Sequence, residues 1–162
     1  MLHSALEGLQ GSALGVFVRE SGPWTYALVN LGHLLGIALL FGGVVLLDLR
    51  LLGVWRLVPL HIVSRLAEPL AVIGFSIAAV TGLALLSANA TEYEDNPFIY
   101  IKMGAIAAGL ANALVVNLLP AWRARRVRDL SLRERRQLAI AGAASLASWV
   151  TAIAAGRLIG YW

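Results

Sequence analysis

A single histidine, His33, interrupts the uncharged run from Trp24 to Leu47. Such a run is long enough to cross a bilayer, and an ionisable side chain at that depth costs about 2 kcal/mol or more unless a partner or a function compensates it. Neutral imidazole is a common axial ligand of haem iron. We therefore predict that His33 is the metal ligand of a bound haem.

Two cations, Lys102 and Arg157, lie in other apolar runs at a similar depth. Lys102 follows Phe98 by four residues, and Arg157 ends a run that returns to the same side. At 1.5 Å per residue, His33 lies roughly 13 Å and Lys102 roughly 6 Å below one membrane boundary. Haem has two anionic propionates, and we expect Lys102 and Arg157 to bind them. Small residues near these positions leave space for a flat macrocycle: Gly36, Gly43, Ala105, Gly109 and Ala113.

Each of these residues also has a purely structural interpretation. His33 could be satisfied by a hydrogen bond to a carbonyl of a neighbouring helix or to Asn112. Lys102 and Arg157 could extend to the lipid headgroups, and the small residues could serve close helix packing. His61 is expected to be an ordinary interfacial residue on the opposite side of the membrane. The sequence has no cysteine, which excludes disulfides, thiolate metal sites and thiol catalysis.

The elements that must position these residues follow from composition. The chain is 59% hydrophobic and only 14% charged, with a mean hydropathy of +0.78, which excludes an ordinary soluble domain. Four runs with little or no charge each reach about 30 Å as a helix, the thickness of the hydrocarbon core. We predict one all-α membrane domain, residues 1–162, built as a four-helix bundle with transmembrane helices at 24–47, 66–90, 98–119 and 138–160.

Local patterns predict two further features. Leucines recur at helical spacing through residues 1–20, opposite His3, Glu7 and Gln10, which indicates an amphipathic helix on the outer membrane surface. Ser131 precedes Glu134 by the three residues of a capping box, so the fourth helix is expected to begin near Ser131.

Acidic residues near the ends of the spans are predicted to have structural roles. Asp48 is expected to form an ion pair with a basic residue of the following loop. Glu68 is expected to stay in the membrane interface, and Pro69 to kink or begin the second span.

The charge distribution predicts the orientation in the membrane. Residues 121–137 hold seven arginines and two acids, whereas the turn at 91–97 holds three acids and no base. By the positive-inside rule the first and third loops are cytoplasmic and both termini are outside. The arginines are expected to contact anionic lipids rather than nucleic acid. The seven are Arg123, Arg125, Arg126, Arg128, Arg133, Arg135 and Arg136.

The sequence resembles an uncharacterised family of small bacterial four-helix membrane proteins. The resemblance rests on Trp24 to Gly53 around His33, on Pro97 to Lys102 followed by Asn112, and on Ser148 to Arg157, which together cover most of the chain. It implies a four-helix fold and a location in the bacterial inner membrane.

A more distant resemblance is to the bacterial four-helix protoporphyrinogen oxidases, at His33 and Lys102, with Arg50 near an arginine that ends their first helix. This resemblance implies haem b and an oxidoreductase. We therefore expect a haem b protein that transfers electrons or carries out a haem-dependent oxidoreductase step. Two alternatives remain open: a cofactor-free accessory or assembly subunit of a larger membrane complex, and an oligomeric carrier of small solutes.

Overall fold

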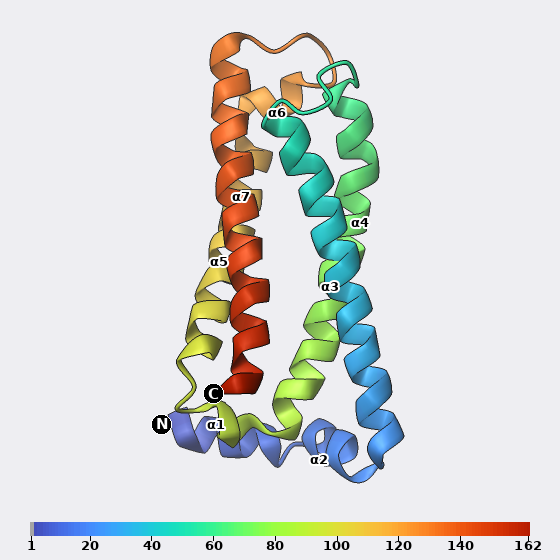
Figure 1. Ribbon diagram of the computed structural model, residues 1–162, viewed down its shortest axis with the longest axis vertical. Coiled ribbons are helices and arrows are strands. Elements are labelled where there is room, and N and C mark those ends of the chain that lie inside the picture. The colour runs from blue at the N-terminus through green and yellow to red at the C-terminus, as the bar shows by residue number, and fades with distance from the viewer. Residues whose placement is uncertain (1) are drawn as a thin grey trace. The chain divides into compact units, whose positions relative to one another are not determined.

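The computed structural model of the protein describes residues 2–162, with side chains from residue 3 onward, and contains no strand in that range (Figure 1). Four of its helices are long and apolar enough to cross a membrane. The protein is therefore an all-α integral membrane protein, as predicted. The four helices are α3 (Pro23–Leu51), α4 (Leu60–Ala88), α5 (Pro97–Leu118) and α7 (Leu132–Leu158).

Two of these helices begin earlier than the apolar runs do. α4 starts at Leu60 rather than at 66, and α7 starts at Leu132 rather than at 138. The predicted capping box at Ser131 is confirmed, since its hydroxyl accepts from the Glu134 amide while the Glu134 carboxylate accepts from the Ser131 amide. Hydropathy detects only the part of a helix that lies in lipid, so it misses polar first turns. Pro69 lies within α4 and does not begin it.

The chain divides into two compact units whose boundaries fall within α3 and α4. Unit 1 contains the residues up to Leu40 together with Val72–Asn96, and unit 2 contains Phe41–Ala71 and Pro97–Trp162. Unit 1 therefore holds the first part of α3 and the last part of α4, as well as the N-terminal helices. Unit 2 holds α5, α7 and the arginine-rich segments.

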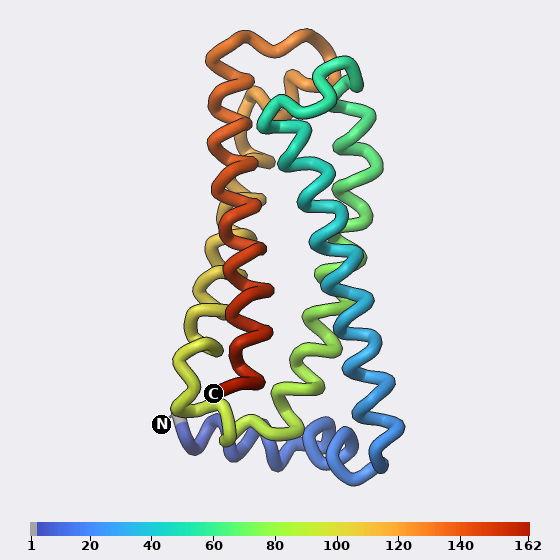
Figure 2. Tube along the Cα trace, in the orientation of Figure 1, coloured from blue at the N-terminus to red at the C-terminus, as the bar shows by residue number. Residues whose placement is uncertain are grey.

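The N-terminal region of unit 1 forms two short helices, where the sequence predicted a single helix over residues 1–20. They are α1 (Leu2–Gln10) and α2 (Ala13–Glu20). Gly11 and Ser12 separate them, and the Ser12 hydroxyl caps α2 by accepting from the Gly15 amide at 3.2 Å. Glycine destabilises a helix interior and serine favours the N-cap position, so the break follows from these two residues. Figure 2 shows both helices running crosswise to α3, with α2 next to its start.

These two helices are fixed to the last turns of α4 and to the segment that follows it. The Gln10 side-chain oxygen accepts from both the amide and the hydroxyl of Thr91, each at 2.9 Å. Arg19 donates to the Ala88 carbonyl at 3.1 Å, and Val18 is buried against Ala84 and Ala88. Thr91 belongs to the short helix η1 (Ala90–Tyr93). The amphipathic region thus packs on protein as well as presenting a surface to solvent or lipid.

His3 adds a contact to this attachment that depends on pH. Its Nδ1 lies 2.6 Å from Glu94 Oε2, and that hydrogen bond, followed by the charges of Glu94 and Glu7, raises the pKa of His3. The pairing favours the protonated ring, so its contribution is complete below the ordinary histidine pKa of about 6.5 and disappears as the pH rises through the higher folded value. We expect the protection factors of the α1 amides, which compare their exchange with that of an unfolded peptide at the same pH, to fall as the pH is raised above neutral.

Two variants check this expectation by hydrogen exchange at a series of pH values. Glu94→Gln should remove most of the pH dependence of the α1 protection factors. Glu92 lies in η1, two residues before Glu94, and is not among the groups that act on His3, so Glu92→Gln should keep this pH dependence. An identical pH profile in the Glu94→Gln protein would show that His3 does not hold α1.

Within unit 1, glycines bring α3 and α4 into backbone contact. A Cβ on Gly74 would lie 2.2 Å from the Leu40 nitrogen and 2.7 Å from the Gly36 oxygen. No side-chain movement relieves a clash with backbone. We expect Gly74→Ala to destabilise the protein by about 1–3 kcal/mol or more, measured by thermal unfolding in detergent. Gly42→Ala is the matched control, because no atom lies within 4 Å of its added carbon.

In unit 2, α5 and α7 lie side by side (Figure 1). Gly109 makes room for the Trp149 ring, whose Cε2 lies 3.0 Å from the position of an added Cβ. Asn112, one of the possible partners considered for His33, donates its amide to the Ala141 carbonyl at 3.0 Å. A buried cluster lies nearer the arginine-rich end, around the short helix α6 (Pro120–Ala124); it consists of Val116, Ala121, Trp122 and Leu138.

Candidate functional site

Nδ1 of the His33 ring, in unit 1, lies within hydrogen-bond distance of two groups of α4. Nδ1 lies 2.9 Å from the Ala78 carbonyl oxygen and 3.1 Å from the Thr81 hydroxyl, both on α4. A carbonyl only accepts, so Nδ1 must carry the proton, and in the neutral ring Nε2 then bears the lone pair. The hydrogen bond to a neighbouring helix carbonyl, considered above as a structural role, is thus present. The same bond is the usual support of a histidine that ligates a metal through Nε2.

A glycine lies directly against this ring. A Cβ on Gly82 would be 2.9 Å from Cε1 of His33, closer than carbon atoms approach. The imidazole therefore occupies space that any larger residue at position 82 would fill. Thr81 donates its own hydroxyl to the Ile77 carbonyl at 2.6 Å, which leaves its oxygen to accept from His33. Adjacent turns of α4 thus fix the orientation of one half-buried imidazole.

The two predicted propionate partners both lie in unit 2. The Lys102 side chain on α5 runs along Gly156 of α7, with Cδ and Cε at 3.6 Å from the position of an added Cβ. The neighbouring Arg157 is exposed, donates to the Tyr161 hydroxyl at 2.7 Å and lies 5.0 Å from the centre of that ring. The structure therefore brings Lys102 and Arg157 to adjoining positions of α5 and α7, while His33 belongs to unit 1.

No group of three or more histidine, aspartate or glutamate side chains in the described part of the chain could hold a metal ion. A metal at His33 would therefore take most of its ligands from outside the protein, as haem iron does from porphyrin nitrogens.

Asp48 does not form the predicted ion pair with a loop residue. Its side chain is only 3% exposed, the Ser145 hydroxyl is hydrogen-bonded to it, and Oδ2 has no hydrogen-bond partner among the described residues. α7 comes close at Gly142, where an added Cβ would lie 3.3 Å from the Asp48 carbonyl oxygen. This close helix contact covers the carboxyl group. A buried acid in a membrane helix is a functional candidate by position, and the sequence did not identify it as such.

Glu68 also departs from the prediction that it simply stays in the interface. Its Oε1 lies 2.7 Å from Arg125, whose guanidinium also donates to Ser64 and to the Trp122 carbonyl and stacks 3.5 Å from the Trp122 ring centre. The Arg125 side chain is 3% exposed. Burial lowers the pKa of Arg125, while the Glu68 carboxylate raises it. Sequence reasoning missed this cluster because Arg125 is one of seven arginines in the same stretch.

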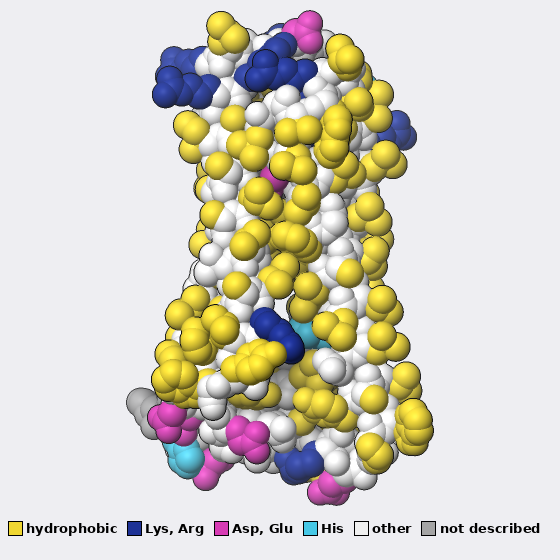
Figure 3. Space-filling model, viewed as in Figure 1, with side chains coloured by type: hydrophobic (Ala, Val, Ile, Leu, Met, Phe, Trp, Pro, Cys, Tyr) yellow, Lys and Arg dark blue, Asp and Glu magenta, His cyan; other side chains and the backbone are white. Residues whose placement is uncertain are grey.

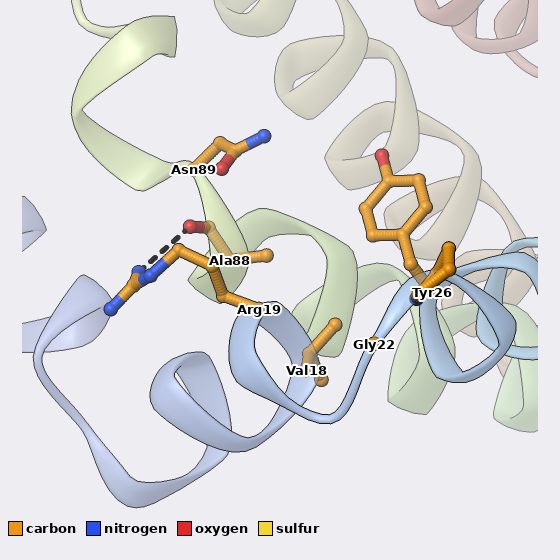
Figure 4. Close-up of a pocket in the computed structure, with 7 residues that line it drawn as sticks. Val18, Arg19, Gly22, Tyr26, Ala88 and Asn89 are labelled. Carbon is orange, nitrogen blue, oxygen red and sulfur yellow. Dashed lines mark hydrogen bonds between the residues drawn. The ribbon is translucent and has the colours of Figure 1, made fainter.

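Unit 1 also contains a small pocket of about 310 Å³ beside the N-terminal helices. Val18, Arg19, Tyr26, Ala88 and Asn89 are among its lining residues (Figure 4). Figure 4 shows the Arg19 guanidinium directed at the Ala88 carbonyl, so its donors serve the attachment of α2. This pocket brings together no set of groups for catalysis.

Comparison with known proteins gives the chain a family. Residues 6–162 match the model of a family of unknown function, DUF6644. The chain belongs to this family. The DUF6644 match extends over both units and includes His33, Lys102 and Arg157. It agrees with the resemblance of the sequence to a family without an assigned activity. No curated protein and no solved structure matches this DUF6644 chain.

Proposed function

We propose that the protein binds haem b through Nε2 of His33 and uses it for electron transfer or a haem-dependent oxidoreductase step. The observation that carries the proposal is the hydrogen bond from Nδ1 to the Ala78 carbonyl, which selects the tautomer able to ligate iron. Haem supplies one-electron chemistry when bound. The distant likeness to the four-helix protoporphyrinogen oxidases supports the same assignment.

The chain's own residues would orient and tune such a ligand. The Ala78 carbonyl and the Thr81 oxygen accept from Nδ1, fix the plane of the ring and increase the basicity of Nε2. Gly82 leaves the space that the ring occupies. Lys102 and Arg157 are the proposed partners of the propionates, since both are cations at adjoining positions of α5 and α7.

The direct test is the visible spectrum of the purified protein, oxidised and reduced, after expression with ample haem. Soret and α bands of a haem b, with about one haem per chain, are expected. Gly82→Ala should shift or weaken these bands by displacing the imidazole, whereas Gly42→Ala, whose added carbon meets nothing within 4 Å, should not. Lys102→Met and Arg157→Met should lower haem retention if the cations bind propionates.

A cofactor-free accessory subunit is the second candidate. The observation in its favour is the same hydrogen bond, since the Ala78 carbonyl by itself offsets part of the cost of placing His33 in an apolar helix. A colourless protein after expression with ample haem would favour this candidate over the first.

We further propose that the protein lies in the bacterial cytoplasmic membrane with both termini outside and the arginine-rich loops in the cytoplasm, near anionic lipids. Ten of the thirteen basic residues agree with this orientation. A reporter enzyme that is active only outside the cytoplasm should be active when it is fused at either terminus, and inactive when it is inserted between Arg128 and Ser131. A reporter that is active only in the cytoplasm should give the opposite result. The reverse of both patterns would invert the orientation.

A further inference from the structure

Unit 2 contains a second, larger pocket that the haem proposal does not use. Its volume is about 760 Å³, within the usual range for sites that bind small molecules. The end of α3, the loop before α4, the segment after α6 and the first turns of α7 line it. Figure 3 shows dark-blue Lys and Arg side chains gathered over these connecting segments of unit 2.

The lining of this pocket is strongly basic. Seven arginines contribute to it, and Asp129 is its only acidic lining residue. Two of the arginines have carboxylate partners, since Arg125 pairs with Glu68 and Arg128 pairs with Glu134. Among the described residues, none of the other five arginines forms an ion pair. These five, hereafter the unpaired arginines, are Arg50, Arg56, Arg126, Arg135 and Arg136.

Three of the unpaired arginines are held in place by backbone carbonyls. The Nε of Arg50 donates to Val58 at 2.7 Å, that of Arg56 to Gly53 at 3.2 Å, and that of Arg135 to Leu130 at 3.0 Å. Each of these bonds uses the nitrogen nearest the stem of the side chain, and Nη2 of Arg50 also donates to the Arg56 carbonyl at 3.5 Å. Each guanidinium is thus oriented and still has N–H donors on its terminal nitrogens, which can bind an oxyanion in bidentate fashion. The pocket is preorganised for an anion.

The unpaired arginines also act on one another. Arg50 lies within the electrostatic influence of both Arg56 and Arg135, and all three charges are positive. Like charges held close together raise the energy of the folded protein, and an anion between them removes that cost. The lining holds five unpaired guanidinium groups and one carboxylate, a net excess of four positive charges. One phosphate group does not neutralise this excess.

The remaining lining is apolar. Leu51, Leu52, Leu57, Leu60 and Leu138 are among its residues. Leu57 and Leu52 are exposed, and Leu138 is buried. A ligand of this pocket therefore meets both arginine and leucine side chains.

The geometry points to a binding site for a molecule that carries two phosphate groups, with an apolar part against the leucines. Two sources share this chemistry: the headgroup of a diphosphorylated lipid, and a soluble diphosphate. Arginine binds both through the same bidentate contacts. The site shares no residue with the proposed haem site, so neither result depends on the other.

The test uses the full-length protein and two charge-matched double variants. Arg126→Gln/Arg136→Gln removes two unpaired arginines of the lining whose side chains form no hydrogen bond within the described residues, so the fold should persist. Arg123→Gln/Arg133→Gln removes the same charge from exposed positions of the same region that do not line the pocket. Both are first checked for unchanged helicity and unfolding temperature.

Two probes distinguish the two sources of phosphate. Inorganic pyrophosphate is titrated by calorimetry into protein in neutral detergent. In a second experiment, protein is reconstituted into phosphatidylcholine vesicles with cardiolipin, which has two phosphates, or with phosphatidylglycerol at twice the mole fraction, which has the same total charge. Lipid retained by the protein after extraction is counted by mass spectrometry.

Binding of pyrophosphate, or retention of cardiolipin over charge-matched phosphatidylglycerol, is expected for the wild-type protein. This binding or retention should be weaker by about tenfold or more in the Arg126→Gln/Arg136→Gln variant, and by about twofold or less in the Arg123→Gln/Arg133→Gln variant. Pyrophosphate binding indicates a soluble ligand, and cardiolipin preference alone indicates a lipid. The proposal would be overturned if the wild-type protein neither binds pyrophosphate nor prefers cardiolipin, or if both double variants lose the same amount of binding. Either result would leave only diffuse attraction to anionic surfaces.

Discussion

His33→Ala is expected to yield a protein without haem from cells in which the wild-type protein is purified with its haem bound. Alanine has no lone pair for the iron, and the described residues provide no cluster of histidine or acidic side chains that would take over as a metal site. A coordinate bond in hydrocarbon compensates the burial of a polar ring, so its loss should be nearly complete. Haem content measured by pyridine haemochrome per chain checks this.

His61→Ala is the matched control, because His61 is a second histidine of the same chain that lies near the start of α4 in unit 2. It should retain its full haem content and an unchanged spectrum. Retention of haem by the His33→Ala protein would instead place the ligand elsewhere. Correct insertion of both variants is established beforehand from their yield in the membrane fraction.

Arg125→Gln is expected to destabilise the folded protein by about 3 kcal/mol, the lower end of what removing one partner of a buried ion pair costs. The Arg125 side chain is 3% exposed, and its loss leaves the Glu68 carboxylate, which is 34% exposed, without its cation. The substitution also removes the contact with the Trp122 ring and the donors to Ser64 and to the Trp122 carbonyl. Chemical unfolding in detergent, followed by circular dichroism, measures the change in free energy.

Arg128→Gln removes the same type of side chain from a pair that faces solvent. Arg128 bonds Glu134 with two nitrogens, at 2.7 and 2.9 Å, but the Arg128 side chain is 56% exposed. Exposed pairs contribute about 0–1 kcal/mol, so this variant should unfold almost as the wild type does. Equal losses in Arg125→Gln and Arg128→Gln would show that burial does not govern the effect.

The membrane class and the number of spans could be read from the sequence, because they depend on local composition. Twenty consecutive apolar residues can satisfy their backbone in lipid only as a helix, whatever the rest of the chain does. The start of α7 at the Ser131 capping box was predicted for the same reason, since the bonds involved join residues three apart. Gly11 and Ser12 carried a similar local signal for the break between α1 and α2, although the leucine spacing alone suggested one helix.

The partners of the polar groups were decided by tertiary structure. His33 stood out in the sequence as an imidazole in an apolar run, but its acceptor, the Ala78 carbonyl, is 45 residues away. Every residue has such a carbonyl, so the sequence does not single this one out. A backbone carbonyl has no side-chain signature, so only the packing of α3 on α4 reveals this bond. The close approach of Gly36 and Gly74 produces that packing.

For the charged residues too, the sequence determined one part and the tertiary structure another. Their clustering in two loops is a property of composition, and it predicted a basic region from the sequence alone. Whether a given arginine is buried against Glu68, paired with Glu134 or left unpaired in a pocket depends on which helix ends meet. Asp48 belongs with them, because a carboxyl at the end of an apolar helix looks accessible until α7 covers it at Gly142. Desolvation is set by neighbours from distant parts of the chain, so the chemistry of these groups emerged only in the folded protein.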